Sequence, residues 1–205
     1  MAITSSMDLF SHIRAEYVGR WLARIEEVKQ SGAFIGVESP LLGEGGVVVP
    51  MERGGFPFRA DIVARNAEGT PKGVSCIFSQ VEIFKPSRFT HDGTMPLMVF
   101  PFFWTAALLR VRGAAPGSVR QELARWAERW FGLVDLSNIE PVSEQDVHGV
   151  IHRIQYLESE CTAETVAFEV DLGSAHVEAL MTLLDALKGI GAKEVVLGDP
   201  SLAQS

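Results

Sequence analysis

Residues 97–112 read LMVFPFFWTAALLRVR and form the most apolar stretch of the chain. A buried strand and a buried helix both give continuous apolar runs, so this stretch has two interpretations. In the helical interpretation, Pro101 takes the first helical position and Gly113 caps the end. In the strand interpretation, Pro101 interrupts the run, and the aromatic residues 102–104 favour a pleated surface. We favour the second interpretation and predict a central strand over 102–112.

Alternation along the predicted strand gives it two unlike faces, because side chains in a strand point to the same face at every second residue. One face carries the alternate apolar positions of 105–111, including Leu109 and Val111, and the other carries Arg110 and Arg112. The first face is therefore expected to be buried. A transmembrane helix is not expected, since it needs about 20 apolar residues and this run meets a proline and then Arg110 too early.

The next segment, AAPGSVRQELARWAERWF at 114–131, has the pattern of an amphipathic helix. Ser118 and Gln121 have the spacing of a capping box at its start. Apolar residues then recur at three- and four-residue steps, which predicts one buried stripe. We expect Trp126 and Trp130 of this stripe to pack over the sheet that holds the central strand.

The C-terminal part continues with further regular elements. Residues 148–158 and 164–172 are predicted to form a hairpin of two strands. A helix is expected to begin at Gly173, and a closing strand to follow at 193–199. The order over 102–199 is then β-α-β-β-α-β, which matches the ferredoxin-like split βαβ arrangement. That fold hosts many unrelated functions, so it names no activity.

The N-terminal part is predicted as a long helix followed by an antiparallel β-meander. Ser5 or Ser6 would cap the helix, which covers about residues 7–30 and has one apolar stripe. The expected strands are 33–37, 47–51, 58–65 and 73–84. The glycine-rich segment 39–46 lacks a following Gly-Lys-Ser/Thr, so we interpret it as a hairpin connection and not as a phosphate-binding loop.

Together these elements predict an α+β fold. An N-terminal helix plus antiparallel β-meander is followed by a ferredoxin-like βαββαβ half, and the sheets are packed with helices on one side. The polar segment 86–96, PSRFTHDGTMP, is interpreted as a boundary or a functional loop, because it is the longest passage rich in turn-forming residues. It divides the chain into 1–96 and 97–205, which form two domains or one continuous domain.

Composition restricts the class of protein. The 205 residues are 47% apolar and 21% charged, which is typical of a globular chain and not of a disordered one. Acidic residues outnumber basic ones by 26 to 18, for a formal net charge of −8, and the basic residues are scattered. This pattern disfavours nucleic acid as a partner. An acidic surface would suit a basic protein partner, although it also serves solubility.

The cysteines and histidines indicate neither a disulfide nor a metal. Cys76 and Cys161 are the only cysteines, and no basic and apolar leader precedes the first helix. We therefore predict a cytoplasmic protein with reduced thiols, no membrane association and no structural zinc site. His148 and His152 are four residues apart, which on a strand separates them by roughly 13 Å, too far to share a metal. No cofactor is expected.

His91 and Asp92 are the candidate catalytic residues. They lie at the tip of the polar segment 86–96, where a histidine beside an aspartate could act as a base with its orienting partner. A catalytic pair would lie at the rim of a pocket bordered by the aromatic residues of 100–104, whereas an ordinary connection would leave both side chains in solvent. No serine or cysteine nucleophile accompanies them at a known spacing.

Arg110, Arg112, Glu169 and Asp171 are the candidate binding residues. The two carboxylates share the polar face of their strand, and antiparallel pairing with the central strand would bring the arginines toward Glu164 and Thr165. The open face of the sheet would then be basic at one end and acidic at the other. Such a face could dock a partner or pack on the N-terminal meander, and we favour packing.

Two classes of function follow from these observations. The first is a non-enzymatic protein-interaction module, such as an inhibitor, an immunity-type protein or a regulatory protein, with a basic protein as partner. The second is a small-molecule-binding protein or enzyme with a pocket between the two halves, near His91 and Asp92. We favour the first. The oligomeric state is not predicted.

Overall fold

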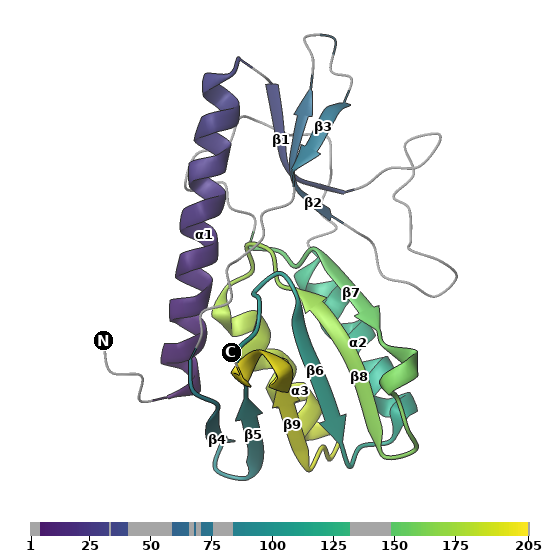
Figure 1. Cartoon of the computed structure of the whole chain (residues 1–205). Coiled ribbons are helices and arrows are strands. Elements are labelled where there is room, and N and C mark those ends of the chain that lie inside the picture. Colours follow the sequence, from purple (N-terminus) through teal and green to yellow (C-terminus); the bar gives the residue numbers. More distant parts are fainter. Residues whose placement is uncertain are drawn as a thin grey trace.

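The computed structural model of the chain describes residues 5–32, 34–40, 59–65, 68, 71–75, 84–131 and 149–204. These residues form an α+β structure with a three-stranded and a six-stranded sheet, as Figure 1 shows. The α+β class predicted from the sequence is thereby confirmed. None of the described helices is long and apolar enough to cross a membrane.

Along the chain, a helix and the strands β1–β3 of the first sheet come first. The strands β4–β6, a helix, two strands, a helix and a last strand follow. Two short 3₁₀ helices, η2 and η3, are inserted in the C-terminal part. The bounds are α1 Ser6–Gln30, β1 Phe34–Pro40, β2 Arg59–Arg65, β3 Pro71–Ser75, β4 Ser87–His91, β5 Met95–Val99, β6 Ala107–Arg112, α2 Pro116–Trp130, β7 Arg153–Tyr156, η2 Glu158–Glu160, β8 Thr165–Asp171, α3 Val177–Gly189, β9 Glu194–Leu197 and η3 Pro200–Gln204.

The predicted central strand is confirmed in β6, which lies inside the six-stranded sheet of order β4-β5-β9-β6-β8-β7. Leu109 and Val111 are fully buried, and Leu109 lies opposite Phe168 of β8 and Leu197 of β9. The predicted start was wrong, because β6 begins only at Ala107. Strands β5 and β6 both flank β9, so the chain between them must cross β9 and cannot stay in the sheet.

The helices α2 and α3 cover one face of the six-stranded sheet (Figure 1). Trp126 is buried, and its indole nitrogen donates to the Ala179 carbonyl of α3 at 2.9 Å. Trp130 is half-buried and donates to Thr182 of α3 at 3.2 Å. Both tryptophans therefore join α2 to α3, and Trp126 belongs to the core over the sheet, as predicted.

Both helices begin at other residues than the sequence suggested. The predicted capping box of Ser118 does not form, since α2 begins at Pro116, whose fixed φ suits the first helical turn. Helix α3 begins at Val177 and not at Gly173. Gly173 has φ +47, a left-handed conformation that an α-helix cannot contain.

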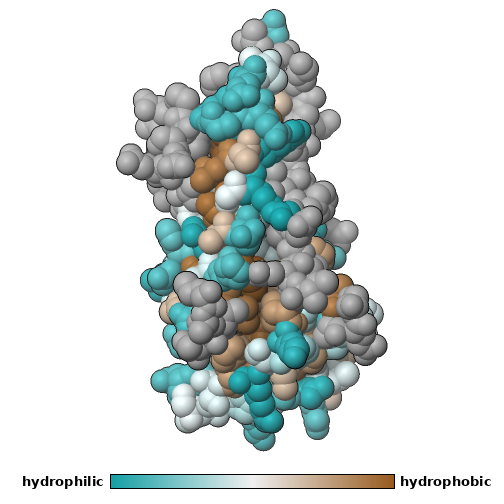
Figure 2. Space-filling model, turned by 60° about the vertical axis from the view of Figure 1, so that its left-hand side comes forward, coloured by the Kyte–Doolittle hydropathy of each residue, from teal (hydrophilic) through white to brown (hydrophobic). Residues whose placement is uncertain are grey.

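Helix α1 matches its prediction closely. Ser5 caps it, because its side chain accepts from the Asp8 amide while Asp8 accepts from the Ser5 amide, a reciprocal capping box. The predicted stripe is buried, namely Leu9, Phe10, Ile13, Tyr17, Trp21 and Ile25. It packs on β1, β2 and α3. Figure 2 shows this side of the molecule, where hydrophilic residues of the exposed helix face border hydrophobic ones.

The three-stranded sheet has the order β1-β2-β3 with antiparallel pairs, as expected for a meander. The strands predicted at 33–37 and 58–65 are confirmed in β1 and β2, and β3 covers the start of the one predicted at 73–84. The strand predicted at 47–51 and the positions of Cys76 and His148 lie outside the described residues.

The segment 86–96 is not a loop, so the loop interpretation was wrong, whereas its interpretation as a boundary stays a prediction. It forms the strand β4, a tight turn and the start of β5, with His91 opposite Met95. Asp92 and Gly93, both with positive φ, are the central residues of a β-turn that the bond from the Thr94 amide to the His91 carbonyl closes at 3.2 Å. The hairpin joins the six-stranded sheet through β5 and β9. The division into 1–96 and 97–205 stays a prediction.

Candidate functional site

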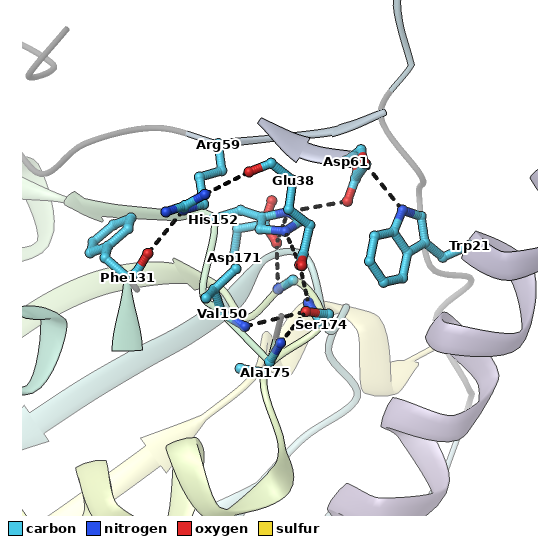
Figure 3. A network of polar contacts seen from close by, with 12 residues as sticks. Trp21, Glu38, Arg59, Asp61, Phe131, Val150, His152, Asp171, Ser174 and Ala175 are labelled. Carbon is cyan, nitrogen blue, oxygen red and sulfur yellow. Dashed lines mark hydrogen bonds and ion pairs between the residues drawn. The ribbon is translucent and has the colours of Figure 1, made fainter. Parts of the chain in front are cut away.

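The polar centre of the structure is His152, which lies directly before β7 and is fully buried. Its Nε2 lies 2.8 Å from Oε1 of Glu38 on β1, a side chain that is also fully buried. The partners come from opposite parts of the chain, 114 residues apart. Figure 3 shows that they meet where the three-stranded sheet approaches the six-stranded one.

Asp61 of β2 faces the other ring nitrogen. Its Oδ1 lies 3.1 Å from His152 Nδ1, a charge contact whose angle falls short of a hydrogen bond. The same oxygen accepts a 2.5 Å hydrogen bond from the Tyr17 hydroxyl of α1, and the Asp61 carbonyl accepts from the Trp21 indole at 3.3 Å. Helix α1 thus holds the carboxylate in place beside the ring.

Asp171, at the end of β8, completes the surroundings of the ring. Its Oδ1 lies 3.9 Å from His152 Nδ1 and accepts from the Gly173 amide at 3.0 Å. Its carbonyl accepts from the His152 amide at 2.8 Å. The Asp171 side chain is 15% exposed, so of the three carboxylates facing the ring it is the one with most access to water.

The backbone around the ring adopts conformations that most residues avoid. Glu38 has φ +49, in the left-handed region that costs a non-glycine residue about 1–2 kcal/mol. Arg59 holds this conformation, because its Nη1 donates to the Glu38 carbonyl at 2.7 Å while its Nε donates to the Phe131 carbonyl at 3.0 Å. At Gly173, a Cβ would lie 2.3 Å from the His152 ring, so only glycine leaves room for it.

The electrostatics favour a charged ring. Burial, the largest single effect, lowers the pKa of His152, but the contacts with Asp61 and Glu38 and the charge of Asp171 outweigh it and raise the pKa from 6.5 to about 10. Burial raises the pKa of Asp171 from 3.8 to about 6, although the charge of His152 opposes the shift. Burial and the Asp61 charge raise the pKa of Tyr17 well above its ordinary value, so its hydroxyl stays a donor.

This arrangement is a buried imidazolium held between carboxylates. Since both ring nitrogens face carboxylate oxygens, neither is free to act as a general base toward a substrate. Ser174 binds the same cluster through its backbone, whose amide donates to Glu38 at 3.3 Å, while its Oγ accepts from the Gly149 amide at 3.0 Å. No group of His, Cys, Asp and Glu within the described ranges could hold a metal ion.

Removal of the Tyr17 hydroxyl tests how much the cluster contributes to the free energy of unfolding. Tyr17→Phe leaves the buried Asp61 carboxylate one donor short, and hydrogen bonds to charged groups contribute about 1.5–3 kcal/mol. We expect the free energy of unfolding to fall by about that amount, measured by urea denaturation. Tyr156→Phe is the matched control, since Tyr156 is a half-buried tyrosine of β7 outside the cluster. Equal losses in both variants would contradict the expectation.

His91 and Asp92 both contact α3. His91 is buried, and its Nε2 lies 2.7 Å from Oδ1 of Asp185, a side chain that is 63% exposed. Asp92 is exposed and pairs with Lys188, a contact that lowers the pKa of the Asp92 carboxyl. The two pairs fasten the β4–β5 hairpin to the helix. A catalytic role for His91 and Asp92 stays a prediction.

The four candidate binding residues do not gather at one place. Arg110 pairs with Glu160 of η2 at 2.6 Å, and Arg112 pairs with Glu194 of β9 at 3.0 Å. In register, Arg112 lies opposite Thr165, as predicted, and Arg110 opposite Ala167.

Glu169 and Asp171 have different surroundings although both lie on β8. Glu169 pairs with Arg153 of β7 at 2.6 Å, whereas Asp171 faces His152. The Asp171 end of the face thus lies beside Asp61 of the N-terminal sheet, while Glu169 keeps 25% of its side chain exposed. A role in binding for any of the four residues stays a prediction.

A cavity of about 970 Å³ opens at the other end of the six-stranded sheet. It lies between the start of α2, the turn before β8 and the start of β9. The side chains of Arg112, Glu164 and Lys193 are among those that line it, and neither His91 nor Asp92 does. The cavity is thus distinct from both the His152 cluster and the predicted pocket.

Comparisons of this chain with protein-family models, with curated protein sequences and with solved structures find no match.

Proposed function

We propose that this chain is a non-enzymatic protein-interaction module of the cytoplasm, such as an inhibitor, an immunity-type protein or a regulatory protein, which docks a basic partner protein. The observation that supports the proposal is the composition of the sheet face turned away from α2 and α3. We call it the open sheet face. It combines half-exposed apolar side chains with charged ones, which is the anatomy of protein–protein interfaces.

The open sheet face follows from the strand register. Residues that lie opposite each other on neighbouring strands point to the same face. Met98 lies opposite Val196, which lies opposite Arg110, which lies opposite Ala167. This row crosses the four strands β5, β9, β6 and β8. Met98 and Val196 are half-exposed and Ala167 is buried, and Leu108 of β6, opposite Glu169, adds a third half-exposed apolar side chain.

The charges around these apolar positions are available to a partner. Arg110 and Glu160 are 26% and 37% exposed in their side chains, and the Arg153–Glu169 pair is 29% and 25% exposed. Exposed pairs of this kind contribute only about 0–1 kcal/mol, so a partner can replace one member at little cost. The net charge of −8 favours a basic partner through attraction over longer distances.

We also infer that residues 107–197 have the ferredoxin-like arrangement expected from the sequence. The element order β6-α2-β7-β8-α3-β9 and the neighbour order β9-β6-β8-β7 support this inference. It concerns the fold alone, since this arrangement hosts many functions.

Charge reversal on the open sheet face tests the proposed function. We expect the immobilised wild-type chain to retain a basic protein from an extract of the cells in which it naturally occurs. Raised salt should release that protein. Glu160→Lys and Glu169→Lys should each abolish the retention, because each places a positive charge that repels a basic partner in the interface. Mass spectrometry identifies the retained protein, and calorimetry with the purified partner gives the affinity.

Glu128→Lys is the matched control, with the same charge change as Glu169→Lys but on the exposed side of α2. It should retain the partner as the wild type does. Circular dichroism verifies that all variants are folded. Equal retention by wild type and both open-face variants would overturn the proposal, and so would a partner that binds only to Glu128 and its surroundings.

A further inference from the structure

Three parts of the molecule meet at His152. The ring contacts Glu38 and Asp61 of the three-stranded sheet, and Asp171 of the six-stranded sheet lies beside it (Figure 3). Tyr17 joins α1 to the same cluster by its bond to Asp61. Carboxylates of both sheets are therefore turned toward the His152 ring.

Backbone hydrogen bonds also join the two sheets near His152. The Arg59 amide of β2 donates to the His152 carbonyl at 2.9 Å, and the Ser174 amide donates to Glu38 at 3.3 Å. Together with the Arg59 guanidinium on the Phe131 carbonyl, these contacts join the three-stranded sheet to the C-terminal part. Apolar packing adds to these polar contacts, because Val37 of β1 and Ile62 of β2 belong to the same core as the buried side of α1.

The conformation of Glu38 gives an independent observation. A non-glycine residue with φ +49 persists only where its surroundings impose it, and such strain is characteristic of functional positions. Here the strained residue is the one whose carboxylate meets His152 Nε2. When that contact is lost, relief of the strain favours separation of β1 from the ring.

The electrostatic balance around the His152 ring depends on whether the ring is protonated. The groups that face or adjoin it are Glu38 from β1, Arg59 and Asp61 from β2, Asp171 from β8, and Arg14 and Tyr17 from α1. Arg59 and Arg14 donate to backbone carbonyls and also act on Glu38 by their charge. Loss of the ring proton takes a positive charge away from beside the buried Glu38 and Asp61, and removing the charge of one partner of a buried pair is strongly destabilising.

We propose that protonated His152 is a latch that holds the three-stranded sheet β1–β3 on the six-stranded sheet, and that loss of its proton releases the three-stranded sheet while the six-stranded sheet stays folded. The latch is a conformational device built into the fold. It does not depend on the proposed function, because the open sheet face lies on other residues.

The six-stranded sheet has the means to remain folded without the latch. Its core consists of apolar side chains from β5, β6, β8, β9 and the two helices on them, including the fully buried Leu109, Phe168 and Leu184. Buried apolar area of this kind stabilises independently of pH. Release therefore is expected to be local, like other sub-global openings of native proteins.

The direction of the pH dependence follows from the two states of His152. In the docked state its pKa is about 10, and after release it returns toward 6.5. A raised pKa in the docked state means that the latch is at full strength below pH 6.5 and is lost as the pH rises through 10. Between these values the equilibrium constant for release should increase about tenfold per pH unit, since one proton is lost with each opening.

Hydrogen exchange of the wild-type chain tests the latch. Protection factors of β1 and β2 amides, corrected for intrinsic exchange, are measured by NMR between neutral pH and about pH 10. They should fall about tenfold per pH unit, while those of β6 and β8 stay constant. The side-chain ¹⁵N shifts of His152 report its protonation in the same samples.

Two variants and a control make the test specific. Glu38→Gln removes one carboxylate from the ring, so the loss of protection should be complete at lower pH than in the wild type. His152→Gln carries no proton to lose, so its β1 and β2 protection should be low and independent of pH. Glu169→Gln removes a carboxylate of the same β8 strand that pairs with Arg153, and it should follow the wild-type curve.

Separate loss of protection in β1 and β2, shifted by Glu38→Gln but not by Glu169→Gln, supports the latch. Parallel loss in both sheets overturns it, because the two then unfold as one unit. Titration of His152 near 6.5 in the folded chain overturns it as well. If His152→Gln does not fold, the wild-type and Glu38→Gln curves still decide between these outcomes.

Discussion

Leu109→Ala is expected to lower the free energy of unfolding by about 2–5 kcal/mol, as large-to-small changes in a packed core do. Leu109 is fully buried in β6, the strand between β9 and β8. Its neighbours in register, Phe168 and Leu197, are also fully buried, so the lost methyl groups leave a cavity that surrounding strands cannot close. The urea midpoint should fall with an unchanged slope.

Arg110→Ala is the matched control for this prediction. It changes the next residue of the same strand, but on the open sheet face, where the side chain is 26% exposed and pairs with Glu160. Its loss should cost at most about 1 kcal/mol. A Leu109→Ala midpoint equal to that of the wild type, or a larger loss in Arg110→Ala, would contradict the position of β6 in the core.

Elements with a long, regular pattern could be predicted from the sequence. The apolar positions of the 25-residue helix α1 recur through about seven turns, and a capping serine precedes the helix. Both the helical period and the first residue of the helix could therefore be predicted. The alternation of 107–112 likewise gave the buried and exposed faces of β6. In these segments the local pattern and the tertiary packing require the same side chains.

The β4–β5 hairpin was missed for a physical reason. Its strands hold only five residues each, and β4 alternates half-buried with exposed residues because it lies at the edge of the sheet. The polar composition therefore suggested a loop. The signal that could have found it is the pair Asp92-Gly93, which favours the positive φ values of a hairpin turn.

The His152 cluster could not be assembled from sequence alone. Glu38 and Asp61 are single acids within short apolar strand segments, and no spacing links them to a histidine more than 90 residues later. The sequence offered only a local signal. An acidic residue at a strand position that should face the core implies that a buried polar partner lies opposite it. Asp171 was singled out, but as part of a charged surface, because its strand pattern does not reveal what covers its end.

The His152 cluster and the open sheet face are separate parts of the molecule. The latch concerns buried groups and is tested by pH and hydrogen exchange, whereas the proposed docking concerns the open sheet face and is tested by retention of a partner. Failure of one leaves the other standing. A partner that binds only after release of the three-stranded sheet would connect them, and its retention would then increase with pH.

Gly173→Ala is the second change expected to have a large effect, of about 2–5 kcal/mol. The residue has φ +47, where an alanine costs about 1–2 kcal/mol more than glycine. Its new Cβ would in addition lie 2.3 Å from the His152 ring, and overpacking of a buried site costs about 1–3 kcal/mol. The ring cannot move aside, because Glu38 and Asp61 hold it from two sides.

Gly19→Ala is the control: it is the same substitution, but it should raise the stability and not lower it. Gly19 lies in α1 with open space around its Cα, so alanine should stabilise the helix by about 0.5–1 kcal/mol. Both variants are measured by urea denaturation, together with the ¹⁵N shifts of His152. In Gly173→Ala the shifts should change, since the ring can relieve the overlap only by lengthening its contacts with the carboxylates. Unchanged stability and unchanged shifts would mean that Gly173 does not press on the ring, and that the fit of His152 into the junction is looser than its contacts indicate.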